Sequence, residues 1–427
     1  MPLFQEQLMQ MAIAIGDCTG DEADLLRRAM GSKRGIERIE SLEAKLYAGM
    51  ARHGLTPEEA DAIYLKIKSF ANFGFAESHA LSFSLLVYAS SWLKLHYPGA
   101  FLAALLRNQP MGFYSPQSLT ADARRHGVTV RRPDVLRSGA QADLEPLAPG
   151  AVVPTGRDAC LERVQPKVEK FVPGTPDPTP AHRRDGAFAV RLGLDEVQGI
   201  GLDVARRIVA ARDERPFADM ADVARRTGLT VAQMESLATA GAFDGFGINR
   251  RQALWNAGYA ESADQLEGTA VQAPPPMLPG MSDVELTMAD LWATRVSPDT
   301  HPVQHLRPLL ASEGILSVAD TAVAEASRRV KVAGLITHRQ RPATASGVTF
   351  LNLEDETGML NVVCSEALWR RYRVVGRNAA GMVIRGMLER SPEGVVNLVA
   401  DKLMRIEEVY PQAARAVPAK HRGRDFR

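Results

Sequence analysis

Basic side chains gather around two glycines near the beginning of the printed sequence. Arg27 and Arg28 end a predicted helix, and Lys33 and Arg34 follow in the turn 31–35. Because guanidinium forks bind phosphate oxygens in pairs, this cluster could clamp a polyphosphate. Basic residues also end many helices, where they complement the helix dipole. The residues alone leave both interpretations open.

A second candidate for anion binding precedes the most apolar segment of the chain. Ser78 and His79 end a polar loop, and residues 80–93 that follow are apolar or small at almost every position. The amino terminus of a helix offers unpaired N–H groups and a favourable dipole to an anion. Alternatively, Ser78 caps the helix and His79 belongs to a core. We expect the helix itself to be buried on all sides.

The segment 197–201 has the spacing of a helix-hairpin-helix motif. Gly199 and Gly201 flank Ile200, and a helix carrying Arg206 and Arg207 follows. Two glycines let such a hairpin expose backbone N–H groups, and the next helix directs its amino terminus at a phosphate. Ile200 would hold the helices together, while the arginines add charge near the DNA backbone. The pattern favours duplex binding, although a Gly-x-Gly turn joins helices in many other folds.

From residue 328 onward the hydrophobic period changes to two. Alternating strands with glycine turns predict an OB-fold barrel. In the strand at 348–355, Phe350 faces away from Leu351 and therefore outward. An outward aromatic ring suits base stacking, but exposed apolar side chains are also common on ordinary surfaces. Arg339 and Arg341, placed in the first loop of the barrel, would supply local positive charge that the net charge of the whole chain hides.

The composition fits a multidomain chain of a reducing compartment. The chain has 427 residues and a formal net charge of +1, so any nucleic-acid surface must be local. Its three cysteines are far apart and form no CxxC pair, which gives no zinc pattern. Neither a signal sequence nor a run of membrane-spanning length is visible. These features predict a cytoplasmic protein without a metal site or a membrane partner.

The elements needed to position these residues predict a multidomain α+β fold. A mainly α domain ends near residue 137, a helix-hairpin-helix domain carries the Gly-x-Gly turn, and an OB-fold β-barrel follows. The expected boundaries are 1–137 for the helical domain, 138–186 for a Pro/Gly-rich linker, 187–260 for the helix-hairpin-helix domain, 261–327 for an irregular connector, 328–410 for the barrel and 411–427 for a basic tail.

Several long stretches resemble one protein family. The fingers region of bacterial C-family DNA polymerases, of the polymerase III α-subunit type, is similar to DEADLLRRAMGSKR and to FGFAESHALSFSLLVYASSWLKLHYPGAF. The error-prone branch of that family is similar to RNQPMGFYSPQSLTADARRHGV and to the final HRGRDFR. The stretches occur in the family's order and cover nearly the whole chain, so the resemblance implies that the helical domain is a fingers domain.

The resemblance also implies a function. Such enzymes are DNA-directed DNA polymerases, nucleotidyltransferases that act in DNA replication, DNA repair, damage-induced mutagenesis and translesion synthesis, with Mg²⁺ held by palm carboxylates. This chain has no Asp-x-Asp pair, so we expect a carboxyl-terminal part that holds no catalytic residue and no metal. The alternative is a non-catalytic module that holds duplex and single-stranded DNA for a partner.

Binding roles and partners follow from the same resemblance. The residues that match the family's contacts to the triphosphate of an incoming deoxynucleotide are Arg27, Arg28, Lys33, Ser78 and His79. Further expected partners are a Y-family-like accessory subunit and the sliding clamp. The segment 274–281 lies where the family often carries its clamp ligand, but it lacks the glutamine and aromatic residue of that ligand.

Overall fold

The computed structural model divides the chain into two compact units, Met1–Leu93 and Lys94–Arg427, which are described separately. The structure describes residues 5–29, 35–69, 77–112, 114–148, 150, 179–258, 277–342, 345–391, 394–411, 413 and 424–426. Among these residues, no helix combines the length and the apolar character needed to cross a bilayer.

The first unit is helical, as the sequence predicts. Its helices are α1 (Gln5–Gly16), α2 (Gly20–Ala29), α3 (Gly35–Glu40), α4 (Glu43–Arg52), α5 (Pro57–Ser69) and most of α6 (Glu77–His96). Leu8, Leu26 and Met50 are fully buried in their common core. The amino end of α5 is capped in both directions, because Glu59 N–H donates to Thr56 Oγ1 and Thr56 N–H donates to a Glu59 carboxylate oxygen.

The expectation that α6 is buried on all sides is wrong for this structure. Leu81, Leu85 and Tyr88 keep 66%, 69% and 74% of their surface exposed, and neighbouring apolar side chains are also open. The core of the first unit is built by α1 to α5 instead. An apolar composition indicates that a helix needs cover, but it does not identify the segment that provides the cover.

The second unit begins with short helices around a small sheet. Helices α7 (Pro98–Arg107), α8 (Pro116–Arg125) and α9 (Thr179–His182) accompany strands β1 (Val130–Arg131), β2 (Asp143–Pro146) and β3 (Phe188–Arg191), which pair in the order β1-β3-β2. Strand β2 lies inside the segment predicted as a linker. Glu145 on β2 pairs with Arg131 and Arg191 on the neighbouring strands, and these contacts hold the strand in the sheet. Most of the predicted linker, residues 151–178, lies outside the described residues.

The helix-hairpin-helix region follows. It contains η3 (Leu194–Glu196), α10 (Leu202–Glu214), α11 (Met220–Thr227), α12 (Val231–Thr239), η4 (Asp244–Phe246) and α13 (Arg250–Ala257). The segment predicted as an irregular connector instead contributes α14 (Asp283–Ala293), η5 (Pro302–Leu306), α15 (Arg307–Ser312) and α16 (Val318–Val323). Ala293 at the end of α14 belongs to the same core as Ile200 and Ile208. Part of the expected connector is therefore a component of the core of the helix-hairpin-helix region.

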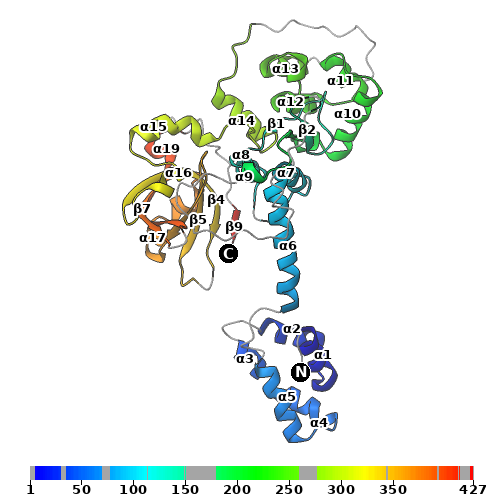
Figure 1. The fold of residues 1–427 in the computed structure, drawn as a ribbon, viewed down its shortest axis with the longest axis vertical. Helices are drawn as coiled ribbons and strands as arrows, with labels where there is room; N and C mark the ends of the chain where they lie inside the picture. Colours follow the sequence, from blue (N-terminus) through cyan, green and yellow to red (C-terminus); the bar gives the residue numbers. More distant parts are fainter. Residues whose placement is uncertain are drawn as a thin grey trace. The chain divides into compact units, whose positions relative to one another are not determined.

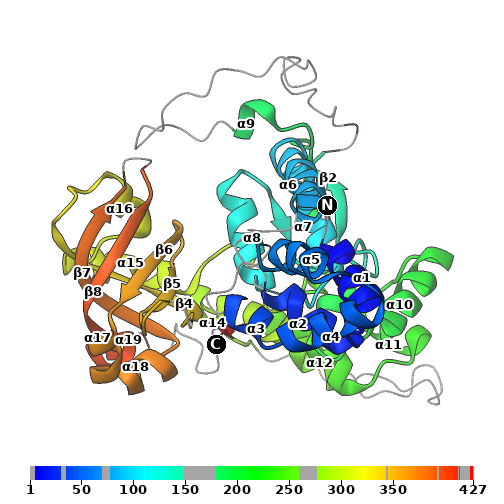
Figure 2. The same cartoon turned by 90° about the horizontal axis from the view of Figure 1, so that it is seen from below.

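The barrel has the predicted strand alternation. Its strands are β4 (Arg329–Gln340), β5 (Thr349–Glu354), β6 (Met359–Cys364), β7 (Gly381–Arg390) and β8 (Val396–Arg405). They pair in the order β5-β6-β8-β7-β4, and an additional β5–β4 pairing closes the barrel (Figure 1). Helices α17 (Glu366–Arg371) and α18 (Arg373–Asn378) lie against the barrel and contact β8 (Figure 2). Helix α19 (Ile406–Val409) follows β8, and β9 (Arg424–Phe426) pairs with β4 inside the segment predicted as a basic tail.

Candidate nucleic-acid interface

The hairpin at Gly199–Gly201 presents backbone groups at the start of α10. Ile200 is 97% buried in the core with Ala205 and Ile208, which fixes the hairpin on its supporting helices. Within the described residues, the N–H groups of Gly199 and Gly201 donate no hydrogen bond. The first turn of a helix also leaves its own N–H groups without helical partners. The hairpin therefore offers a set of outward backbone donors that a phosphate can accept.

Glycine occurs at the two positions of the hairpin for different structural reasons. Gly199 has a φ of +81°, a conformation that other residues adopt only with strain. Gly201 has an ordinary φ of −75°, and a Cβ built on it would meet no protein atom within 4 Å. The fold itself does not require glycine at position 201. The empty space in front of Gly201 instead leaves room for a ligand to approach the backbone.

A groove runs beside the hairpin and contains acidic as well as basic groups. It has a volume of about 600 Å³ and is lined by Glu196, Gly199, Gly201, Arg107 and Arg295, among others. Burial raises the pKa of Glu196 to about 7, and the adjacent Asp195 charge acts in the same direction. The charge of this groove therefore changes near neutral pH.

Arg206 and Arg207 lie on the exposed side of α10. Arg206 keeps 64% of its side chain exposed and lies 3.5 Å from the Asp203 carboxylate, one turn earlier on the same helix. Arg207 is also exposed. Such a weak surface ion pair leaves Arg206 free to exchange its partner for a phosphate.

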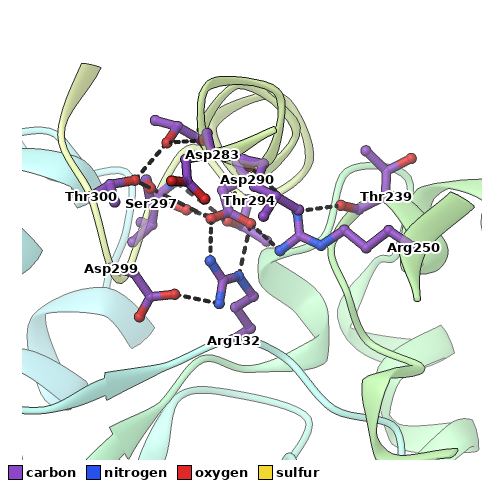
Figure 3. A network of polar contacts seen from close by, with 12 residues as sticks. Arg132, Thr239, Arg250, Asp283, Asp290, Thr294, Ser297, Asp299 and Thr300 are labelled. Atoms are coloured by element: carbon purple, nitrogen blue, oxygen red, sulfur yellow. Dashed lines mark hydrogen bonds and ion pairs between the residues drawn. The ribbon is translucent and has the colours of Figure 1, made fainter. Parts of the chain in front are cut away.

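A buried polar network holds the elements behind the hairpin in place (Figure 3). Asp290 on α14 accepts two hydrogen bonds from Arg132, of 3.0 and 2.8 Å, and one of 2.6 Å from Arg250 on α13. The backbone N–H of Gln198 then donates to the carbonyl of Ala293, at the end of α14. The hairpin is thus tied through α14 to a charged centre in which Asp290 is 2% exposed.

Phe350 lies on the outer face of the barrel, as the strand pattern predicts. Leu351 and Leu353 are fully buried inside the barrel, whereas Phe350 and Asn352 are half-buried on the other side of β5. Phe350 lines a cavity of about 440 Å³ together with Tyr114, His338, Gln340, Pro342, Asn352 and Asn361. The ring of Tyr114 meets that of His338 edge to face, with centroids 5.8 Å apart. Tyr114 belongs to the segment between α7 and α8, outside the barrel.

The two arginines predicted for the first loop of the barrel have different environments. Arg339 lies within β4, is 7% exposed, and donates to the carbonyls of Gly376 and Ala379 at 2.7 and 2.5 Å. Its guanidinium therefore fastens α18 to the barrel, and the expectation of a DNA contact at Arg339 is corrected. Arg341 keeps 47% of its side chain exposed, 3.9 Å from Glu366, and remains open to solvent.

The sequence does not point to Tyr114, His338 or Asn361 as site residues. The alternation along the strand places Asn352 on the same outward side as Phe350. Asn361 and His338 become neighbours of Asn352 only through the strand register. No local pattern marks Tyr114, because its partners are more than 200 positions later in the chain.

The structure describes only part of the basic corner, the cluster of Arg27, Arg28, Lys33 and Arg34. Arg27 and Arg28 both contact the Asp24 carboxylate, at 2.7 and 2.6 Å, on the exposed side of α2. The hydrogen bond from Arg27 lowers the pKa of Asp24. Lys33 and Arg34 lie outside the described residues. The structure therefore places two of the four cations together and leaves both of them accessible.

At the predicted site of Ser78 and His79, the structure describes the helix that carries both residues and the side chain of His79. Helix α6 begins at Glu77, so Ser78 is its second residue, and the Ser78 side chain lies outside the description. His79 is exposed rather than part of a core, and its ring packs against Phe83 with centroids 4.3 Å apart. The alternative that assigned His79 to a core is therefore wrong.

The described residues do not fit a bound metal ion. Among them, no group of three His, Cys, Asp or Glu side chains is arranged to hold one. Asp355, which lies between Glu354 and Glu356, accepts hydrogen bonds from Val318 N–H and Arg307.

Three family models match separate parts of the chain. Residues 1–54 match the finger domain of the bacterial DNA polymerase III alpha subunit, residues 127–253 match a helix-hairpin-helix motif, and residues 330–406 match an OB-fold nucleic acid binding domain. These matches agree with the three regions predicted from the sequence. The helix-hairpin-helix match begins before the predicted boundary and includes the sheet β1-β3-β2.

Curated relatives match the chain along nearly its whole length. An error-prone DNA polymerase of Cutibacterium acnes is 52% identical over 97% of this chain, and one of Nocardia farcinica is 50% identical over 94%. One of Mycolicibacterium paratuberculosis is 47% identical over the full chain. The chain spans 37%, 33% and 35% of the length of these relatives, respectively. Among solved structures, an asparaginyl-tRNA synthetase of Pyrococcus horikoshii aligns with 22% of this chain and with 23% of its own length. The TM-score of this match is 0.19 and the sequence identity is 15%.

Proposed function

Because this chain belongs to the family of bacterial error-prone DNA polymerases, and spans about a third of its relatives' length, we propose that it is the carboxyl-terminal, DNA-holding part of such a polymerase. The complete enzyme would copy damaged templates in damage-induced mutagenesis and translesion synthesis. The hairpin would hold the duplex and the barrel a single strand. The observation that carries this proposal is the open backbone at Gly201, where glycine serves no need of the fold.

The duplex role is supported by the hairpin's geometry. Outward N–H groups near Gly199 and Gly201 can donate hydrogen bonds to any phosphate, whatever the base sequence. The exposed Arg206 and Arg207 add charge on the following helix. Binding of this kind releases counterions and weakens steeply as salt rises.

The experiment measures duplex affinity of the full chain by fluorescence anisotropy at several salt concentrations. Gly201→Val should weaken binding by about tenfold, the effect of losing one or two hydrogen bonds to a charged group. Its melting temperature should stay close to the wild-type value, because a Cβ at position 201 meets no protein atom within 4 Å. Gly201→Ser, which is small and polar, serves as the matched control. Unchanged affinity and salt slope in Gly201→Val would show that the hairpin is only a structural turn.

A nucleotide role for the basic corner belongs to the same proposal. Arg27 and Arg28 are exposed and share Asp24, a partner that a triphosphate can replace. Lys33 and the amino end of α6 at Ser78 and His79 would complete the contact. In a polymerase reconstituted with the remaining two thirds, Arg28→Ala should raise the nucleotide KM or lower kcat while DNA affinity holds. A loss of thermal stability alone would identify the arginines as a helix cap.

The chain by itself is proposed to extend no primer, because its sequence has no Asp-x-Asp pair to hold two metal ions. We place no metal-dependent step on this chain. The same absence favours, as the second candidate, a non-catalytic module that holds DNA for a partner. Clamp and accessory-subunit contacts remain part of the proposal for the complete enzyme. Mg²⁺-dependent incorporation by the purified chain, after removal of contaminating polymerase, would overturn this point.

A further inference from the structure

The outer face of β4, β5 and β6 carries a row of polar side chains that crosses four strands. Asn352 on β5 lies opposite His338 on β4 and opposite Asn361 on β6. Asn361 in turn lies opposite Asn397 on β8 and donates a 2.8 Å hydrogen bond to its side-chain oxygen. Neighbouring strands are about 4.8 Å apart, so the row places amide groups side by side along a continuous floor.

Aromatic rings stand beside this row on two sides. Phe350 lies one outward position along β5 from Asn352, about 7 Å away by strand geometry, and opposite Gln340. Tyr114 reaches over the barrel from the segment before α8 and touches the ring of His338. Tyr114 is 46% exposed, so part of its ring faces the cavity rather than the protein. The floor of amides is therefore bounded by rings from two different regions of the chain.

The position of Tyr114 is fixed by a buried contact beneath the same face. Glu354, the next outward residue of β5 after Asn352, is 1% exposed and accepts a 2.9 Å hydrogen bond from Ser118 Oγ on α8. Ser115, directly after Tyr114, caps α8 by accepting from Ser118 N–H. The segment that carries Tyr114 is thus anchored to the barrel close to the end of the cavity.

The cavity has the chemistry of a site for an unpaired base. Its volume of about 440 Å³ lies within the ordinary range of ligand pockets, and none of its described lining residues carries a carboxylate. Amide side chains can donate and accept hydrogen bonds along the edge of a base, and aromatic faces stack on any base. Arg341 follows Gln340 at the rim and is exposed, where a strand's phosphate would pass.

We infer that this composite cavity holds one unpaired nucleobase of a single DNA strand, stacked on Phe350, walled by Tyr114 and read at its edge by Asn352 and Asn361. The inference rests on the proposed single-strand role of the barrel and adds to it a residue from outside the barrel. Tyr114 also lies outside the part of the chain that matches the OB-fold model, 330–406. The ligand is a base within a strand, because the aromatic rings would stack on the base and Arg341 at the rim would bind a phosphate of the strand.

The test measures binding of the full chain to a labelled single strand of about 10 nucleotides, and to the same strand with abasic positions at its centre. Tyr114→Ala should weaken binding of the intact strand about 5- to 100-fold, and should abolish the difference between the intact and abasic strands. Tyr114→Phe should keep wild-type affinity. Trp292→Ala serves as the control, because Trp292 is an exposed aromatic residue on α14 that does not line the cavity. Duplex affinity and melting temperature should be unchanged in all three variants.

A second variant separates this inference from the function on which it rests. Asn352→Leu should weaken binding and reduce the differences in affinity among homopolymeric strands of the four bases. If Phe350→Ala weakens binding while Tyr114→Ala and Asn352→Leu do not, the composite cavity is rejected and the barrel's single-strand role stands. If all three variants bind like the wild type with unchanged melting temperatures, both are rejected. Photo-crosslinking of a halogenated uracil strand to Tyr114 would support the inference directly.

Discussion

The hairpin at Gly199–Gly201 offers backbone N–H groups to a ligand, whereas the outer face of β4, β5 and β6 offers side chains. In the hairpin, the important residues are those with little or no side chain. On the barrel face, rings and amides from several strands and from Tyr114 meet in one cavity. A backbone site suits the phosphates, which are identical along any duplex, while a side-chain site suits the bases, which a single strand exposes.

The two sites also differ in what supports them. The hairpin depends on a buried charged network centred on Asp290, and the barrel face depends on an apolar interior and on the buried acid Glu354. A site made of backbone must be held rigidly by the elements that support it, because it cannot adjust by changing side-chain rotamers.

Removing Asp290 should have the largest effect on stability. Asp290→Ala leaves Arg250, which is 5% exposed, and Arg132 without their shared carboxylate. Breaking a buried ion pair from one side costs about 3–5 kcal/mol. Thermal or urea unfolding of the variant should show this loss, and duplex binding should weaken as the hairpin loses its support. Asp203→Ala, at a 97% exposed position on α10, is the control and should change stability by less than about 0.5 kcal/mol. Equal stability of the two variants would contradict the role given to the network.

The buried acid beneath the barrel face should make stability depend on pH. Burial raises the pKa of Glu354 to about 7 from an ordinary value of 4.5, so the folded state binds its proton more tightly than the unfolded state. This stabilisation is complete below pH 4.5 and is lost as the pH rises through 7. Glu354→Gln mimics the protonated form and should be more stable than the wild type at pH 8.5 by on the order of 3 kcal/mol.

The difference between Glu354→Gln and the wild type should vanish near pH 4.5. The measurement is a series of unfolding curves across this pH range. Glu366→Gln provides the control, since the Glu366 side chain is 43% exposed and its replacement should change stability by less than about 0.5 kcal/mol. A constant difference for Glu354→Gln would mean that folding does not raise the pKa of Glu354 above its ordinary value.

The two hairpin glycines should respond differently to the same substitution. Gly199→Ala places a Cβ at a φ of +81° and should cost about 1–2 kcal/mol of stability. Gly201→Ala should leave stability unchanged or slightly raised, because its backbone conformation is ordinary. Parallel denaturant titrations of both variants measure this. Equal losses of stability at the two positions would contradict the view that the fold requires glycine at position 199 but not at position 201.

The smallest expected effect concerns the groove beside the hairpin. Because the pKa of Glu196 is raised to about 7, Glu196 is largely neutral at pH 6 and largely ionised at pH 8. A new negative charge near a bound phosphate is repulsive, so duplex affinity should fall a few-fold over this range, on the order of 1 kcal/mol. Glu196→Gln should flatten the decline. Anisotropy titrations at fixed ionic strength test this. If affinity fell with pH in Glu196→Gln as it does in the wild type, Glu196 would not be the group that repels the bound DNA.

The sequence predicts the hairpin well because all its determinants lie within a few neighbouring residues. Gly199, Ile200 and Gly201 are consecutive, and the helix that follows them is next in the chain. The barrel strands were also predictable, since the alternation of Phe350 and Leu351 is a local signal. The network around Asp290 was not, because Asp290 and Arg132 are 158 positions apart.

The remaining differences have the same physical origin. Ser118 and Glu354 are 236 positions apart, so the anchored segment that brings Tyr114 to the barrel has no local sequence signal. Arg339 was placed in a loop, but β4 continues through it and buries its side chain. The apolar character of α6 predicts burial on all sides, whereas the structure leaves Leu81, Leu85 and Tyr88 exposed.

If the hairpin at Gly199–Gly201 holds duplex DNA and the barrel face with Phe350 holds single-stranded DNA, substitutions at the two sites should affect different forms of DNA. The affinities of both DNA forms are measured for Gly201→Val and Phe350→Ala in the full chain. We predict that Gly201→Val loses about tenfold in duplex affinity but little in single-strand affinity. Phe350→Ala should show the opposite pattern, with a single-strand loss of about 1–3 kcal/mol. If each variant weakened both forms equally, while its melting temperature stayed at the wild-type value, the division of roles would be contradicted.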